Sequence, residues 1–287
     1  MTTNQDTVIR RSVQLPSGKL DYREAGTGPP VVFVHGAVVN SGLWRHVLPL
    51  VAEAGFRCLA VDLPLGSHTT PMPPGADLSP PGLAGLIAEF LDTLDLTEVT
   101  VVANDTGGAL TQILMAEHPE RLAGVVLTPC DALDCFFPPM FAPLTKFARL
   151  PGSMWVLAQL LRWQVVRRSP LAYGFLTKRP IPDDVLDSYV GPARRDRAIR
   201  RDTRRFLTAV HHRYTEAAAE RLPDFDHPVL LVSAADDRVF PARLFQRLAE
   251  LLPKVRRATV ADSYTFVPED QPAELARLVV DFLRSGS

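Results

Sequence analysis

Short apolar runs rich in β-branched residues alternate with helix-spaced segments along most of this 287-residue chain. The clearest runs are VVFVHG (31–36), CLAVDLP (58–64), VTVVAND (99–105) and LAGVVLTP (122–129). Segments with apolar residues at α-helical spacing separate them, at 41–54, 81–96 and 108–118. Strands that are apolar on both faces and alternate with amphipathic helices predict a parallel sheet covered by helices on both sides.

The alternation stops at Cys130 and resumes after about Arg221. The interval is rich in Pro, Phe, Leu, Trp and Arg, contains several helical stretches and lacks a strand pattern. Two strands joined by a turn are expected before the alternation, and two further strand and helix pairs after it, at 229–234, 241–252, 256–262 and 272–284. We therefore predict a sheet of about eight strands in a core domain of residues 1–131 and 223–287, with an inserted helical cap at 132–222.

Composition excludes several classes of protein. The chain is 46% hydrophobic, has a formal net charge of −1, and contains no apolar run long enough to span a membrane. Near-zero net charge disfavours a nucleic-acid-binding protein, and three cysteines are too few for a disulfide framework or a zinc site. We expect a monomer or homodimer in the cytoplasm that acts on a small-molecule substrate, with no cofactor, metal or membrane partner.

The segment VTVVANDTGGALTQ (99–112) carries the strongest chemical signal. A buried strand is expected to end at Asn104 and Asp105, and a helix to begin after Gly107 and Gly108. A side chain on such a sharp strand-to-helix turn projects into a pocket above the sheet, near the positive end of the helix. Asp105 is therefore a candidate catalytic residue, although aspartate is also a common helix N-cap.

This pattern of a small residue, a nucleophile and a glycine (Ala103, Asp105, Gly107), together with His35-Gly36, resembles the α/β-hydrolase superfamily. The resemblance extends from about residue 7 to 284. It includes the strand order, the inserted cap and the acidic turn SAADDRVFP (233–241). An aspartate at the turn is similar to the branch that contains haloalkane dehalogenases, fluoroacetate dehalogenases and epoxide hydrolases, whereas esterases usually carry serine there.

The resemblance implies a role for each residue of the site. Asp105 would attack an electrophilic carbon and form an ester, and the backbone N–H groups of Ala37 and Thr106 would form the oxyanion site. Asp237 would be the acid of the catalytic triad, with Asp131 as the alternative.

The sequence departs from the family at the catalytic histidine. Relatives carry Gly-His-Phe after the last strand, but ADSYTFVPED (261–270) places Tyr264 and Thr265 before Phe266. Threonine cannot act as a general base at neutral pH, so an ester on Asp105 is expected to persist. His68, His211 or His212 could replace the missing histidine, and the cap tyrosines Tyr173, Tyr189 and Tyr214 are candidate proton donors.

Five further residues are candidates to line the substrate pocket, namely His35, Trp44, Asn104, Phe136 and Tyr264. Two halide-binding features of dehalogenases are replaced, because Thr106 follows the nucleophile and Ala37 follows His-Gly. The leading hypothesis is an enzyme that uses Asp105 on a small or medium apolar substrate, of the epoxide hydrolase or dehalogenase type. The alternatives are a lyase, isomerase or cyclase that uses Asp105 as a general acid or base, and a ligand-binding protein that has lost catalysis.

Overall fold

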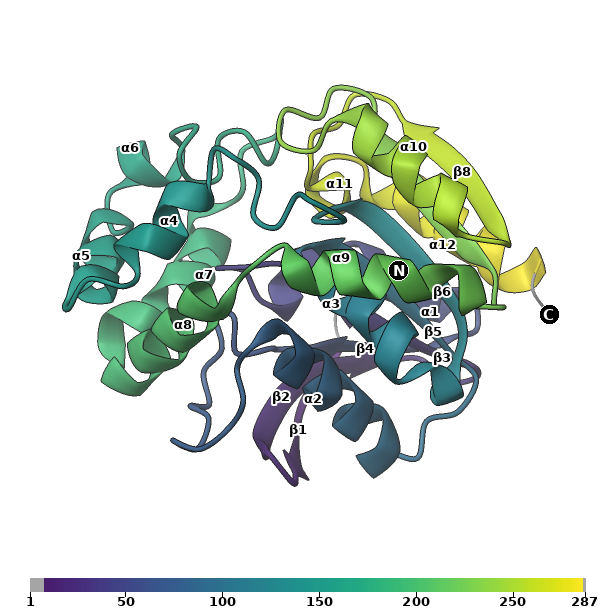
Figure 1. Ribbon diagram of the computed structural model, residues 1–287, viewed down its shortest axis with the longest axis horizontal. Helices are drawn as coiled ribbons and strands as arrows, with labels where there is room; N and C mark the ends of the chain where they lie inside the picture. The colour runs from purple at the N-terminus through teal and green to yellow at the C-terminus, as the bar shows by residue number, and fades with distance from the viewer. Residues whose placement is uncertain (1–7, 286–287) are drawn as a thin grey trace, which may run out of the picture.

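The structure, a computed structural model, describes residues 8–285 and contains one eight-stranded sheet (Figure 1). Its strand order is β1-β2-β4-β3-β5-β6-β7-β8, in which β2 is antiparallel to β1 and β4 and all other neighbours are parallel. The strands are β1 (Ile9–Leu15), β2 (Gly18–Ala25), β3 (Pro30–Val34), β4 (Arg57–Val61), β5 (Val99–Asp105), β6 (Leu122–Cys130), β7 (Val229–Ala234) and β8 (Val255–Val260). The predicted α/β-hydrolase fold with a mostly parallel sheet is confirmed.

Burial explains the strand patterns. Every residue of β5 is buried, and β3 and β4 are buried except at their first residues, because helices cover both faces of the sheet. The edge strand β8 differs, since Arg256 and Arg257 on it are exposed. Charged residues on an edge strand disfavour pairing with another chain.

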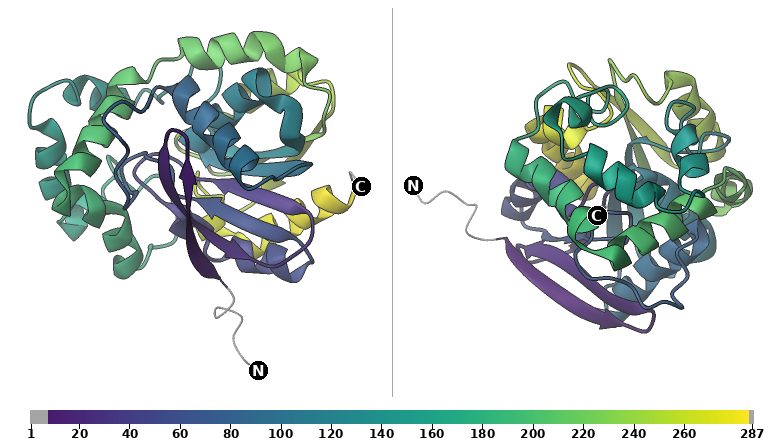
Figure 2. Two further views of the ribbon diagram at one scale, coloured as in Figure 1. Left: turned by 90° about the horizontal axis from the view of Figure 1, so that it is seen from below. Right: turned by 90° about the vertical axis from the view of Figure 1, so that its left-hand side faces the viewer.

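Helices pack on both faces of the sheet. On one face α1 (Val47–Glu53) contacts α12 (Pro272–Ser285), and on the other α3 (Thr106–Glu117) contacts α2 (Pro80–Thr93) and α9 (Arg213–Arg221). Figure 2 shows α2 and α3 on one side of the strands and α12 on the other. Helix α10 (Ala242–Leu251) contacts β7. Three short turns complete the core, η3 (Pro119–Arg121), η4 (Leu222–Asp224) and α11 (Val267–Asp270).

The helix expected over 41–54 is divided in two. A 3₁₀ turn, η2 (Ser41–Trp44), precedes α1, and the side chain of Asn40 accepts a hydrogen bond from the Gly42 N–H at the start of this turn. The apolar spacing is shared by both pieces, so periodicity alone did not separate them.

Five helices of the inserted segment lie together at one end of the molecule, on the left of Figure 1. They are α4 (Ala142–Phe147), α5 (Ser153–Leu160), α6 (Gln164–Arg167), α7 (Asp183–Arg195) and α8 (Arg197–Ala209). Helix α9 follows them but lies along α3. Within residues 8–285, every helix is too short or too polar to cross a membrane.

Candidate active site

The turn between β5 and α3 holds Asp105 in an unusual backbone conformation, with φ 56° and ψ −131°. The two glycines that follow allow the close approach of neighbouring strands. A Cβ atom on Gly107 would lie 2.6 Å from the carbonyl oxygen of Val34, and one on Gly108 would lie 2.3 Å from Cβ of Cys130. We call residues 105–108 the Asp105 turn. The side chain of Asp105 makes no capping hydrogen bond to α3, which argues against a purely structural N-cap role for this residue.

The turn after β3 lies directly against the Asp105 carboxylate. The N–H of Ala37 donates to Oδ2 of Asp105 at 3.2 Å, and a Cβ on Gly36 would lie 2.0 Å from the same oxygen. Burial raises the pKa of Asp105 from 3.8 to about 6, while the N–H groups of Thr106 and Ala37 lower it and the charge of Asp237 raises it. The two N–H groups expected to form an oxyanion site thus both interact with this carboxyl group.

A cavity of about 410 Å³ opens onto Asp105. Ala37, Val38 and Asp105 line it from the core, and residues of the inserted segment line the rest. Those residues are Phe137, Met140, Phe141, Pro143, Leu144, Phe147, Leu157, Leu161, Leu171, Ala172, Tyr173 and Leu176. The cavity is therefore apolar except for one carboxyl group and one tyrosine, a composition suited to an apolar small molecule.

Tyr173 is the cap tyrosine that reaches the cavity. Its hydroxyl donates to the carbonyl oxygen of Val38 at 2.6 Å, and burial raises its pKa, so the phenol is protonated at neutral pH. Tyr189 is fully buried with its hydroxyl 3.5 Å from Glu269, and Tyr214 lies beside Arg213. Neither of them lines the cavity.

Asp237 and Thr265 are in direct contact. Oδ1 of Asp237 accepts hydrogen bonds from Oγ1 of Thr265 at 2.9 Å and from the N–H groups of Val239 and Phe240 at 2.8 and 3.1 Å. Within residues 8–285, the buried Oδ2 of Asp237 has no hydrogen-bond partner. Burial raises the pKa of Asp237, and these hydrogen bonds partly oppose the rise.

Asp131, the alternative acid, is also buried. The hydroxyl of Thr106 donates to its Oδ2 at 3.2 Å, and Oδ1 has no partner among the described residues. Burial holds the pKa of Asp131 well above its ordinary value, and the neighbouring charge of Asp105 adds to the effect. The carboxyl group of Asp131 is therefore harder to ionise than that of an exposed aspartate.

Two buried carboxyl groups, Asp105 and Asp131, and the half-buried Asp237 therefore cluster around the end of β5. In the part of the chain that the structure describes, no Lys, Arg or His side chain forms a hydrogen bond or ion pair with Asp105, Asp131 or Asp237. No group of three or more His, Cys, Asp or Glu side chains in residues 8–285 could hold a metal ion. The arrangement offers a carboxylate nucleophile or acid, two N–H donors and a phenol, without a neighbouring base.

The candidate histidines lie elsewhere. The ring of His68 is 3.4 Å from the buried carboxylate of Asp202. His211 and His212 are exposed, and His212 lies 3.8 Å from Glu216. None of the three lines the cavity.

The five residues expected to line the substrate pocket are not among the residues that line this cavity. His35 is fully buried and its Nε2 lies 2.9 Å from the N–H of Leu63, so it fixes the turn after β3. Trp44 is buried against Phe33 in the core. These side chains follow the strand ends but point into packed protein.

The other three of these residues also have structural contacts. Asn104 donates to the carbonyl oxygens of Thr265 and Pro129, at 2.9 and 3.1 Å, and to the hydroxyl of Thr128. Phe136 is buried beside Phe137, which lines the cavity in its place. The ring of Tyr264 lies beneath the guanidinium of Arg238. Aromatic content alone could not show which neighbour faces the cavity.

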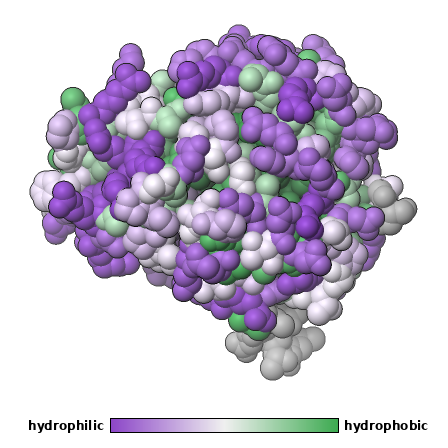
Figure 3. All heavy atoms as spheres, turned by 60° about the horizontal axis from the view of Figure 1, so that its bottom comes forward, coloured by the Kyte–Doolittle hydropathy of each residue, from purple (hydrophilic) through white to green (hydrophobic). Residues whose placement is uncertain are grey.

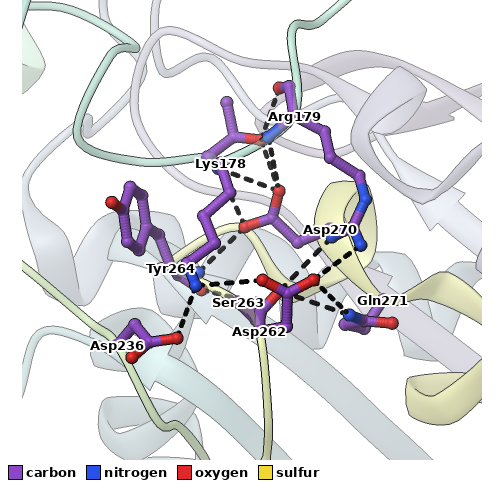
Figure 4. A network of polar contacts seen from close by, with 9 residues as sticks. Lys178, Arg179, Asp236, Asp262, Ser263, Tyr264, Asp270 and Gln271 are labelled. Atoms are coloured by element: carbon purple, nitrogen blue, oxygen red, sulfur yellow. Dashed lines mark hydrogen bonds and ion pairs between the residues drawn. The ribbon is translucent and has the colours of Figure 1, made fainter.

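Sequence reasoning missed the polar network that holds the loop after β8 (Figure 4). The carboxylate of Asp270 accepts from the N–H groups of Lys178, Arg179 and Tyr264, at 2.9, 3.0 and 2.9 Å, and from the hydroxyl of Thr177. The ammonium of Lys178 pairs with Asp236 and Asp262. Apart from Tyr264 and Asp270, which are six residues apart, the partners are 58 to 93 residues apart, so no local sequence pattern indicates the network.

Comparison with known proteins gives the family of this chain. Residues 31–278 match the model of the alpha/beta hydrolase family. A haloalkane dehalogenase from Mesorhizobium japonicum is 32% identical over 189 residues, which cover 64% of this chain and 59% of that relative. The chain thus matches less than two thirds of that relative's length.

Two other proteins match almost the whole chain. The cis-3-alkyl-4-alkyloxetan-2-one decarboxylase of Shewanella oneidensis is 25% identical, with 97% of this chain and 90% of the relative covered. The structure of haloalkane dehalogenase DbeA from Bradyrhizobium elkani superposes with a TM-score of 0.80 at 21% identity, over 97% of this chain and 98% of the other. This chain therefore belongs to the alpha/beta hydrolase family and is an enzyme of that family.

Proposed function

We propose that Asp105 attacks an electrophilic carbon of an apolar substrate, an epoxide or an alkyl halide, and that the resulting ester persists. The observation that carries the proposal is the position of the Asp105 carboxyl group. It lines an otherwise almost wholly apolar cavity, touches the N–H of Ala37, and has no basic side chain as a partner among the described residues. Family members named haloalkane dehalogenase support the substrate class.

The covalent step needs one carboxylate oxygen and a leaving group. The Asp105 oxygen that is not bound to Ala37 forms a C–O bond to the substrate carbon, while the C–O bond of the epoxide or the C–halogen bond breaks and its electron pair stays with the leaving atom. The N–H of Ala37 holds Oδ2, and the N–H of Thr106 also donates to this carboxyl group, so the two donors orient the attacking oxygen. The apolar walls exclude water from the carboxylate and so increase its reactivity.

The cavity favours an epoxide over a halide. An opened epoxide carries an alkoxide, which needs a proton, and Tyr173 is a protonated phenol on the cavity wall. Tyr173 would then regain its proton from water. A halide would need N–H donors at the cavity wall, and Thr106 and Ala37 occupy the positions where dehalogenases commonly place Trp and Asn.

Among the described residues, the site has no general base for hydrolysis of the ester. Water must add to Cγ of Asp105 and lose a proton, with the oxyanion bound by the N–H groups of Ala37 and Thr106. The hydroxyl of Thr265 donates to Asp237 and cannot accept that proton. Loss of a general base typically slows such a step by roughly 10²–10⁴-fold.

Intact-protein mass spectrometry tests the proposal. Incubation with 1,2-epoxyoctane should add the mass of one epoxide, and 1-chlorohexane should replace one proton by a hexyl group, with either adduct mapping to Asp105. Asp105→Asn should remain unlabelled, whereas Asp131→Asn, which alters a buried carboxyl group outside the cavity, should still be labelled. Absence of an adduct together with product release by the wild type would contradict a persistent ester.

A second variant tests the role of position 265. Thr265→His should raise the rate of ester hydrolysis about a hundredfold or more, because an imidazole beside Asp237 can take the proton from water. Thr265→Ser, which keeps the hydroxyl, is the matched control and should leave the ester in place. A thermal melt of each variant separates a loss of base catalysis from a loss of folding.

A non-hydrolytic reaction is the second candidate, and the pKa of Asp105 favours it. A carboxyl group with a pKa of about 6 can exchange a proton near neutral pH. One relative is named a decarboxylase of an alkyl-substituted lactone, and loss of CO₂ from a lactone consumes no water. Turnover of cis-3,4-dialkyloxetan-2-one without an Asp105 adduct would favour this candidate. Binding without adduct or turnover would favour a ligand-binding role.

A further inference from the structure

The exposed large apolar side chains of this protein are concentrated in the cap. Those between residues 150 and 171 are Leu150, Trp155, Val156, Leu160, Trp163, Val165 and Leu171. Trp163 is 60% exposed and Leu171 79%. Elsewhere among the described residues, Ile9 and Leu50 are the exposed large apolar side chains. We call the seven side chains the cap patch.

Other parts of the surface look different. The face in Figure 3 is mainly hydrophilic, and its apolar residues form small separate areas. Single exposed apolar residues are normal on a protein, but a concentration on one element marks an interaction site.

Helix α5 is apolar on both of its faces. Met154 and Ala158 are buried, and Leu157 faces the cavity. Trp155, Val156 and Leu160 lie on the opposite face and are exposed. A helix that is apolar on both faces is normally covered on both, whereas nothing within residues 8–285 covers the outer face of α5.

The charge around the cap patch identifies the chemistry of the partner. Residues 135–182 contain seven Lys or Arg and no Asp or Glu. Lys146, Arg149 and Arg162 are exposed and form no ion pair within residues 8–285. Two acidic residues of α7, Asp183 and Asp187, contact this region, but they already pair with Arg168 and Arg167. The patch is therefore apolar with a cationic rim.

The cap patch is continuous with the wall of the cavity. Leu171 is exposed and also lines the cavity, and Leu157 and Leu161 line it from α5 and its end. Helices α4, α5 and α6 lie at the end of the molecule farthest from β8 (Figures 1 and 2). A planar surface could therefore meet this end without obstruction from the sheet.

We propose, in contrast to the expectation from composition that the chain has no membrane partner, that the cap patch binds peripherally to an anionic lipid bilayer, so that the cavity receives substrate from the membrane. Exposed Trp and Leu side chains partition into the interface between headgroups and acyl chains, and arginine and lysine bind anionic headgroups. A second copy of the chain fits less well. In a two-fold dimer the same patch faces itself, which would bring two cationic rims together without acidic partners. Binding does not depend on the reaction at Asp105.

Vesicle co-sedimentation tests this proposal with the intact chain. Wild type should bind vesicles of phosphatidylcholine with 30% phosphatidylglycerol, bind pure phosphatidylcholine more weakly, and lose much of the difference in 0.5 M salt. Two of the three tryptophans lie in the patch and Trp44 is buried, so a blue shift of the intrinsic fluorescence should accompany binding.

Two double variants locate the binding surface. Trp155→Ser/Trp163→Ser should lower the partition coefficient tenfold or more, while the control Ile9→Ser, a similarly exposed residue on β1, should change it less than twofold. Lys146→Gln/Arg149→Gln should lower it about tenfold on anionic vesicles, whereas the control Arg243→Gln/Arg257→Gln should not.

Three results would overturn the proposal. One is that the wild type does not bind anionic vesicles. Another is that the tryptophan double variant binds them as well as the wild type does. The third is a wild-type dimer that the tryptophan double variant converts to a monomer, with no vesicle binding, because the patch would then be a contact between copies. A failed mass-spectrometry test at Asp105 leaves these measurements unaffected, so the two proposals can fail separately.

Discussion

The Asp105 turn and the loop after β8 (residues 261–266) both supply residues to the candidate site, but they are held in different ways. Local backbone geometry and neighbouring glycines shape the Asp105 turn. The loop after β8 depends on a distant segment. The carboxylate of Asp270 binds the Tyr264 N–H and also the N–H groups of Lys178 and Arg179, and the carbonyl oxygen of Leu176 accepts from the Phe266 N–H at 2.6 Å. The first loop is shaped mainly by its own sequence, and the second is positioned by residues 176–179 of the cap, between α6 and α7.

The largest effect on labelling is expected from substitution of Gly36, because there is no room for a side chain between this residue and Asp105. Gly36→Ala would place Cβ 2.0 Å from Oδ2 of Asp105, so the carboxylate must move from its N–H donor. We expect labelling of Asp105 by 1,2-epoxyoctane to slow a hundredfold or more. Gly75→Ala, a site with nothing within 4 Å, is the control. If Asp105 is labelled in Gly36→Ala as fast as in the wild type, the turn after β3 is less constrained than its geometry implies.

The pH dependence of the labelling rate should give the pKa of Asp105 directly. Only the carboxylate attacks carbon, so the labelling rate should be constant above about pH 7 and fall tenfold per pH unit below the pKa of about 6. A stopped-time labelling series from pH 4.5 to 8.5 measures this. If the labelling rate instead follows the titration of a carboxyl group with an ordinary pKa, the raised pKa of Asp105 is contradicted.

The same pKa also predicts a change in stability. Asp105 has a pKa of about 6 when folded, above its ordinary value of 3.8, so it favours folding below pH 4 and loses that contribution as pH rises to about 6. Asp105→Asn should therefore become more stable relative to wild type over this range, by roughly 3 kcal/mol. Urea denaturation of both proteins at several pH values gives the difference.

The loop after β8 should respond most to loss of Asp270. In the wild type, three backbone N–H groups donate to the carboxylate of Asp270, and Asp270→Asn would direct an amide N–H₂ group toward some of these donors. The substitution should therefore lower the free energy of unfolding by roughly 2–3 kcal/mol. Asp281→Asn is the control, because within residues 8–285 this carboxylate pairs only with exposed Arg277. An equal, small effect of the two substitutions would show that the network does not hold the loop.

The smallest effect is expected at the outer edge of the same network. Lys178→Met removes the ion pairs to Asp236 and Asp262, which lie at the surface and are screened by salt. We expect a change in melting temperature well below that of Asp270→Asn and absent in 0.5 M NaCl. A larger change than that of Asp270→Asn would make the ion pairs, and not the buried carboxylate, the main support of the loop.

Much of the fold could be predicted from the sequence because its cause is local. Uniformly apolar runs such as 31–36 and 99–105 indicated buried parallel strands, and the glycines after Asp105 indicated a sharp turn at the end of one of them. The same turn identified the one carboxyl group that lines the cavity. Periodicity and backbone sterics act over a few residues, so they can be read without the structure.

The cavity wall could not be predicted in this way. Trp44 and Phe136 looked like substrate contacts, yet packing in three dimensions buried both and left Phe137, Leu157 and Tyr173 on the wall. Periodicity assigns apolar residues to a face but does not say which face a cavity touches.

The sequence by itself therefore determined the layered α/β fold, the inserted cap and the position of Asp105 at a strand end. Only the tertiary structure decided which carboxyl groups lie together, which of the tyrosines reaches the cavity, and that no described residue covers the outer face of α5. The physical reason is the range of the forces involved. Backbone preference and hydrophobic periodicity act between near neighbours in the chain, whereas burial and charge interactions depend on residues brought together from distant segments.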